Sequence, residues 1–171
     1  MIHVDYKKIK TLVVDLDGVL TNGRYSVFED GKIFKSFHTR DFDAMRRLEE
    51  NNINVIVLTQ SSASCLSAKM RGMKEESRKN IQTMFNIEDK FLTLDGYLRA
   101  NNLEWSDIAY MGDAENDIKC LSHAGISACP VDAIKEVKHL SGMNYISKKA
   151  GGQGCVYTFI KHIKFYRGGS L

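Results

Sequence analysis

Several features that mark other classes of protein are missing from this 171-residue sequence. Proline occurs only at Pro130, and no Pro/Gly/Ser-rich linker, internal repeat or low-complexity tract indicates a domain boundary. No apolar run is long enough to cross a bilayer, and Met1 to Lys10 lacks the apolar core of a secretory signal. We therefore expect residues 1–171 to form a single domain of a cytoplasmic protein, with no membrane partner.

Paired cysteines and a strong charge of one sign are also missing. The four cysteines lie far apart and form no Cys-x-x-Cys pair, which argues against a zinc site or a redox motif. The 24 basic residues nearly balance the 21 acidic ones, so the basic stripe typical of nucleic-acid-binding proteins is not indicated. We expect no nucleic-acid partner.

Short apolar runs, rich in β-branched residues, are present and alternate with helical patterns. Ile9 to Leu16, Ile53 to Leu58 and Ile108 to Met111 are predicted to be buried strands. This alternation predicts an α/β fold, a doubly wound, mainly parallel Rossmann-like sheet that binds ligands at the carboxyl ends of its strands. The other predicted elements are helices at Phe42 to Asn52, Ser62 to Met70, Lys90 to Asn101, Glu115 to His123, Ala133 to His139 and Val156 to Phe165, and strands at Ile126 to Ala128 and Tyr145-Ile146.

A β-hairpin is predicted between the first strand and the first helix. Arg24 to Phe28 and Ile33 to Phe37 are β-prone runs, and Asp30-Gly31 between them is a strong turn signal. The segment has room for a hairpin flap but not for a separate cap domain. Its apolar side chains exceed what an isolated ribbon can bury, which fits packing between subunits or packing on its own domain.

Three aspartates follow predicted strands. Asp15 and Asp17 end the first strand, and the two-residue period of a strand directs both to one side. Two carboxylates in one cleft need a cation or a shared proton, although Asp-Gly is also a common turn. Asp113 follows Ile108 to Met111 in the same way and would complete an oxygen ligand set for Mg²⁺, although it also suits a helix cap.

Two further residues suit phosphate binding. Thr59 ends the second buried strand, and its hydroxyl with the next two backbone amides could hold a phosphate oxygen, while Ser61 and Ser62 also suit a helix cap. Lys90 begins a predicted helix, where its ammonium either reaches inward to an anion or, as most lysines do, lies in solvent.

Taken in order, these residues resemble the four motifs of the haloacid dehalogenase-like phosphatase superfamily. The matching segments are Asp15-x-Asp17-Gly18-Val19-Leu20-Thr21, Thr59, Lys90 and Gly112-Asp113-x-x-x-Asp117. A narrower resemblance, which spans nearly the whole chain, is to the 3-deoxy-D-manno-octulosonate 8-phosphate phosphatase subgroup. It is carried by Thr21-Asn22-Gly23, the hairpin, Arg40-Asp41 and Gly151-Gly152-Gln153-Gly154.

The resemblance implies a Mg²⁺-dependent phosphatase. In such an enzyme the catalytic residue Asp15 attacks the phosphoryl group, and Asp17 protonates the leaving oxygen and then activates water. The metal would be bound by the Asp15 carboxylate, the Asp17 backbone carbonyl and Asp113, with Asp117 supporting this acidic end. The resemblance also implies a homotetramer in which neighbouring subunits shield the site.

The substrate implied by the resemblance is a small molecule, a phosphorylated sugar acid. Gln60, Phe42 and Gln153 stand where the subgroup has other residues, and glutamine cannot replace the two-point charged contact of an arginine. Arg40 then either binds the substrate carboxylate or pairs structurally. The candidate phosphate and substrate contacts are Thr59, Gln60, Lys90 and Arg40.

Other functions share parts of this pattern. One is a phosphatase for a nonulosonate (sialic-acid-type) 9-phosphate, and another is a non-catalytic assembly module of a sugar-nucleotide synthetase system. A phospho-acceptor signalling domain also combines strand-end carboxylates with a threonine, a lysine and Mg²⁺. Its acceptor lies on a middle strand, whereas Asp15 follows the first strand, so the order of residues disfavours this third function.

Overall fold

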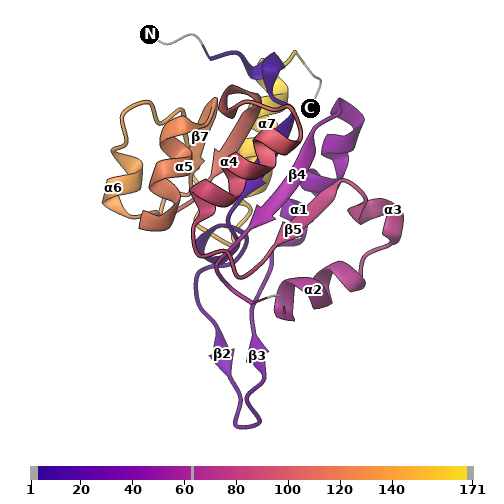
Figure 1. The fold of residues 1–171 in the computed structure, drawn as a ribbon. Coiled ribbons are helices and arrows are strands. Elements are labelled where there is room, and N and C mark those ends of the chain that lie inside the picture. The colour runs from indigo at the N-terminus through magenta and orange to yellow at the C-terminus, as the bar shows by residue number, and fades with distance from the viewer. Residues whose placement is uncertain (1–3, 63, 169–171) are drawn as a thin grey trace.

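The computed structural model describes residues 4–62 and 64–168, and Figure 1 shows their arrangement. Six parallel strands form the central sheet in the order β5-β4-β1-β6-β7-β8. The strands are β1 (Thr11–Val14), β4 (Asn54–Leu58), β5 (Ile81–Met84), β6 (Ile108–Met111), β7 (Ile126–Cys129) and β8 (Tyr145–Ile146). The sheet therefore has β1, with Asp15 at its end, between β4 and β6.

Helices cover both faces of the sheet. Leu12 and Val14 of β1 pack into the hydrophobic cluster on one face, while Val13 packs into the cluster on the other. The first face is covered by α1 (Thr39–Arg46), α2 (Ser64–Arg71) and α7 (Cys155–Tyr166), and the second by α4 (Lys90–Ala100), α5 (Ile118–His123) and α6 (Lys135–Lys138). This two-sided burial explains the continuous apolar strands, and the predicted doubly wound α/β fold is confirmed.

Strand register brings the carboxyl ends of three strands to one edge. Val14 pairs with Val57 of β4 on one side and with Met111 of β6 on the other. The β1 side chains are fully buried, and burying each apolar side chain stabilises the fold by about 1.5–3 kcal/mol. The residues just beyond these strands are therefore fixed at the same edge of a rigid sheet.

The predicted hairpin is present and projects from the carboxyl edge of the sheet (Figure 1). It consists of β2 (Ser26–Val27) and β3 (Ile33–Phe34), which pair antiparallel, and Gly31 adopts a φ of 79° in its turn. The exposed apolar side chains of this hairpin are Tyr25, Val27, Phe28, Ile33 and Phe34. The described residues form no separate cap domain.

Two elements were not predicted from the sequence, the edge strand β5 and the short helix α3 (Glu75–Arg78). The first helix begins at Thr39, earlier than predicted, and continues as a 3₁₀ turn, Arg47–Asn51. Further 3₁₀ turns are Tyr6–Lys8, Trp105–Asp107 and Glu115–Asp117. In the two described ranges, every helix is too short or too polar to span a bilayer.

Candidate active site

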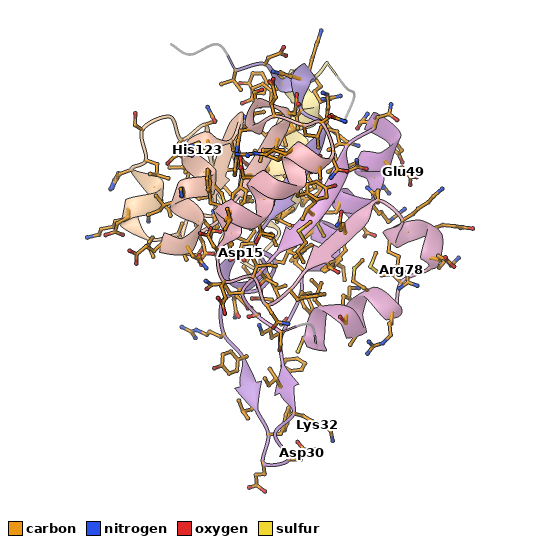
Figure 2. The ribbon with its side chains drawn as sticks, in the orientation of Figure 1. Asp15, Asp30, Lys32, Glu49, Arg78 and His123 are labelled. Carbon is orange, nitrogen blue, oxygen red and sulfur yellow. The ribbon has the colours of Figure 1, made fainter. Side chains whose placement is uncertain are left out.

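Asp15 lies at the edge of the sheet from which the hairpin projects (Figure 2). Its backbone N–H continues the pairing of β1 with β6 by donating to the Met111 carbonyl at 3.0 Å. The chain then turns sharply through Leu16–Leu20, which closes when the Thr21 N–H donates to the Leu16 carbonyl at 2.9 Å. Strand pairing and this turn together fix Asp15 and Asp17 at the carboxyl edge.

Two glycines allow the site to close tightly. Gly18 has a φ of 90°, and a Cβ at this position would overlap the Asp113 carboxylate. A Cβ at Gly112 would overlap the side chain of Asp117. Each glycine therefore lets the backbone approach a carboxylate more closely than any other residue would.

Lys90 is the cation at the centre of the site. Its side chain is 1% exposed, and its Nζ lies 2.9 Å from Asp15 Oδ1 and 2.7 Å from Asp117 Oδ1. Burial lowers the pKa of Lys90, but the charges of Asp15 and Asp117 outweigh burial, and the net effect raises it. Lys90 therefore stays protonated and neutralises part of the acidic cluster.

Asp117 is fully occupied by hydrogen bonds from its own chain. Oδ1 accepts from Lys90 and from the Tyr110 hydroxyl, both at 2.7 Å. Oδ2 accepts from the backbone N–H groups of Asp113 and Ala114, at 3.0 and 3.2 Å. Asp117 therefore holds Lys90 and the loop after β6 in place, and Tyr110 was not expected at the site from the sequence.

The carboxylates of Asp15, Asp113 and Asp117 form one acidic cluster, in which Asp15 and Asp113 would hold a divalent metal ion and Asp117 is taken up by its own hydrogen bonds. Each offers an oxygen within 4.8 Å of the other two. Burial, followed by the charge of Asp117, raises the pKa of Asp15 to about 8 and of Asp113 to about 7. Asp113 Oδ1 is buried and has no hydrogen-bond partner among the described residues. A small hard cation would offset the repulsion between these carboxylates and would give Asp113 Oδ1 a partner.

The Asp17 carboxylate faces the hairpin. Lys35, just after β3, donates to Oδ1 and Oδ2 at 2.7 and 2.6 Å, Thr21 donates to Oδ1 at 3.0 Å, and Ser61 donates to Oδ2 at 2.5 Å. Burial raises the pKa of Asp17, but the hydrogen bonds from Lys35 and Ser61 outweigh burial and lower it overall. Asp17 is therefore ionised in this arrangement.

Thr59 and Gln60 follow β4 at the same edge. Thr59 is buried, and its hydroxyl accepts the Ser61 N–H at 3.0 Å. Gln60 is exposed, donates to the Glu88 carbonyl at 3.2 Å and accepts from the Asn116 amide at 2.9 Å. Thr59 thus lies inside the site, and Gln60 bridges two loops at its rim.

The structure does not bring Arg40 to the carboxylates. Arg40 is exposed on α1, where it lines a groove of about 340 Å³ whose other basic residues are Arg47 of the following 3₁₀ turn and Lys161 and Lys164 of α7. Phe42, two residues on, is buried in the core, so it is not a substrate contact. The role of Arg40 in binding substrate stays a prediction.

The comparisons with known proteins place this chain beside hydrolases. The sequence pattern of the haloacid dehalogenase-like hydrolases matches residues 63–159, more than half of the chain. N-acylneuraminate cytidylyltransferase A from Danio rerio is 30% identical over 156 residues, 91% of this chain and 35% of that protein. This chain thus spans about a third of the length of the cytidylyltransferases that it matches.

A second group of relatives is covered over most of its length. The 3-deoxy-D-manno-octulosonate 8-phosphate phosphatase of Haemophilus influenzae is 27% identical over 150 residues, 86% of this chain and 78% of that protein. The cobalt-bound structure of the Haemophilus influenzae deoxy-D-mannose-octulosonate 8-phosphate phosphatase superposes with a TM-score of 0.82 at 25% identity, covering 95% of this chain and 91% of that one. The resemblance drawn from the motifs is confirmed.

Proposed function

Because the chain belongs to the haloacid dehalogenase-like hydrolases, we propose that it hydrolyses phosphate monoesters with Mg²⁺, using Asp15 as the nucleophile. In this proposal residues 1–171 act as one domain of that family. The observation that carries the proposal is the buried set at the carboxyl edge. Asp15 lies against the Lys90 ammonium, and one buried oxygen of the nearby Asp113 receives no hydrogen bond from the residues that the structure describes.

The chain's own residues would carry out two steps. In the first, an Asp15 oxygen attacks phosphorus, the bond from phosphorus to the leaving oxygen breaks, and Asp17 gives that oxygen a proton. In the second, Asp17 takes a proton from water, the water oxygen attacks phosphorus, and the bond to Asp15 breaks. Inorganic phosphate leaves, and Asp15 is regenerated.

The remaining residues would hold charge in place. Lys90 and the hydroxyl and amides at Thr59 would bind phosphoryl oxygens, which is most of what phosphoryl transfer requires. Mg²⁺ held by the Asp15 carboxylate, the Asp17 backbone carbonyl and Asp113 would neutralise phosphoryl charge and keep Asp15 ionised. Asp117 would support this end by fixing Lys90.

The ionised state of Asp17 constrains the first step. The second step requires this ionised form, because Asp17 then accepts a proton from water, although the lowered pKa makes it a weaker base. The proton for the leaving oxygen must reach Asp17 first, and the monoanion of a phosphate ester, whose second pKa is about 6, can bring it. Substrate binding and protonation of Asp17 would then be one event.

For the substrate, we propose a phosphorylated sugar acid such as 3-deoxy-D-manno-octulosonate 8-phosphate. The support is the curated relative of that name, which this chain covers over most of its length. A nonulosonate 9-phosphate is the alternative within the same chemistry. Gln60 forms its own hydrogen bonds at the rim, so it is a candidate for distinguishing these substrates.

A second candidate function is a non-catalytic assembly module of a sugar-nucleotide synthetase system. It is supported by the higher identity to the cytidylyltransferases and by the small share of their length that this chain covers. The intact arrangement of Asp15, Lys90, Asp113 and Asp117 favours catalysis, because a purely structural module has no need of an unpartnered buried carboxylate oxygen.

We also propose that the protein is a homo-oligomer. The family resemblance implies that this oligomer is a tetramer. The hairpin supports this, because it projects beyond the sheet (Figure 1) and its apolar side chains are exposed among the described residues. Neighbouring copies would then shield a site that the described residues cover with no cap domain.

The test is phosphate release from a panel of sugar phosphates in the presence of Mg²⁺. We expect hydrolysis by the wild-type protein, and loss by roughly 10⁴-fold or more in Asp15→Asn, which removes the nucleophile. The control is Asp43→Asn, an exposed carboxylate on α1. Equal activity in Asp15→Asn and wild type would refute the mechanism, and a wild-type protein that releases no phosphate from any ester would favour the assembly module.

A further inference from the structure

Lys35 is a half-buried cation that belongs to the hairpin and contacts the catalytic edge. It follows β3 directly, on the segment that returns from the hairpin to α1. Its side chain is 10% exposed, and its ammonium donates to both oxygens of Asp17. The same ammonium lies 3.4 Å from Ser61 Oγ and 5.9 Å from the centre of the Tyr25 ring.

Three separate segments hold the Asp17 carboxylate. Thr21 comes from the turn after β1, Ser61 from the loop after β4, and Lys35 from the base of the hairpin. Each oxygen of Asp17 thus receives two hydrogen bonds. A carboxylate bonded from three directions has one orientation, and only Lys35 links that orientation to the hairpin.

Stability alone does not account for this ion pair. The Lys35 side chain is 10% exposed and that of Asp17 29%, and even partial removal of such a pair from water carries a desolvation cost that offsets much of their mutual attraction. An apolar residue at position 35 would pack in the neighbouring cavity, about 210 Å³, whose lining includes Leu16, Ile33 and Leu66. The charge is better explained by what it does to Asp17.

We propose that Lys35 is a positioning residue, which fixes the Asp17 carboxylate for proton transfer to the leaving oxygen and from water. The hairpin then does more than cover the site, because its base sets the geometry of the acid/base residue. This inference rests on the proposed phosphatase function. Displacing a catalytic group by about 1 Å can cost roughly a hundredfold in rate, so even a small rearrangement would be measurable.

The experiment compares wild type, Lys35→Met and Lys32→Met, each as the full chain with Mg²⁺. Lys32 is the matched control, because it is exposed and pairs with Asp30 at the tip of the hairpin (Figure 2). Two substrates are used. An alkyl phosphate has a leaving oxygen that needs a proton, whereas 2,4-dinitrophenyl phosphate releases a phenolate that does not.

We expect Lys35→Met to lower kcat for the alkyl phosphate by roughly 10- to 100-fold, with a much smaller change in KM. With dinitrophenyl phosphate, rapid mixing should show a first turnover close to the wild-type rate followed by slow turnover, because only the second step then needs Asp17. Lys32→Met should match wild type with both substrates, and Lys35→Arg should recover part of kcat.

Two results would overturn the inference alone. One is a kcat for Lys35→Met within about twofold of wild type on the alkyl phosphate. The other is an equal loss in the first turnover with dinitrophenyl phosphate, which would place Lys35 at the phosphate and not at Asp17. If Lys35→Met does not fold by circular dichroism, Ser61→Ala removes another donor to Asp17 and should give the same pattern. Absence of wild-type hydrolysis would instead refute the proposed function, and this inference with it.

Discussion

Replacing Lys90 by methionine tests the electrostatic design of the site without reference to any substrate. Methionine is apolar and similar in length, so the substitution removes the charge while filling most of the space. In the structure, Lys90 Nζ lies 2.9 Å from Asp15 and 2.7 Å from Asp117, and all three side chains are buried. The variant leaves two buried carboxylates without their shared cation.

The expected loss of stability is large because a buried charge is uncovered. Removing one partner of a buried ion pair typically costs about 3–5 kcal/mol. With a urea dependence of about 2 kcal/mol per M, the unfolding midpoint should fall by about 1.5–2.5 M. Exchange of the exposed Lys79 for methionine should change stability by less than about 0.5 kcal/mol.

The assay is equilibrium urea unfolding by circular dichroism in the presence of EDTA at pH 9, above the Asp15 pKa of about 8, for Lys90→Met and for the double variant Asp15→Asn with Lys90→Met. The double variant has one fewer uncompensated carboxylate, so it should be more stable than Lys90→Met. Mg²⁺ should raise the midpoint of Lys90→Met more than that of wild type, because its site carries more negative charge. A double variant no more stable than Lys90→Met would show that lost packing, and not uncompensated charge, causes the effect.

Two further predictions concern other parts of the molecule. Asp41 is fully buried, accepts the Tyr157 N–H at 2.7 Å, and has a pKa raised by burial to about 6. The folded protein then binds more protons than the unfolded chain between about pH 4 and 6, so this group lowers the unfolding free energy by about 3 kcal/mol as pH rises through that window. Asp41→Asn should flatten the profile measured by urea unfolding, and an unchanged slope would contradict the assignment. Phe34→Asp on the hairpin should lower the mass of the assembly measured by light scattering. Leu92→Asp on α4, an apolar position that is also well exposed, should leave this mass unchanged. An unchanged mass in Phe34→Asp would rule out assembly through the hairpin.

The positions of Asp15 and Asp113 were predictable from the sequence because each lies within two residues of the end of a buried strand. A parallel sheet must bring such residues to one edge, whatever the details of its helices. Lys90 was predictable in part, since the start of a helix that packs on the sheet also lies at that edge. For these residues, order along the chain and hydrophobic pattern suffice.

Lys35 was not predictable in this way. The hairpin contains both Lys32 and Lys35, and only the fold of its base decides which one turns inward to Asp17. Tyr110 was missed because it occupies an apolar strand, where an aromatic residue is expected to pack and not to donate to Asp117. β5 was missed because an edge strand with the exposed Gln82 lacks the continuous apolar pattern of the inner strands.

The loop before α7 has a consequence for how the site is completed during folding. A Cβ on Gly151 would overlap the Gly18 carbonyl, and the Gly152 N–H donates to the Val19 carbonyl at 2.9 Å. The turn that carries Asp17 is thus closed from outside by a segment more than 130 residues later in the chain. A chain still being synthesised would contain every acidic residue of the site before it had the segment that holds their turn in shape. Activity should therefore be among the last properties that the folding protein acquires.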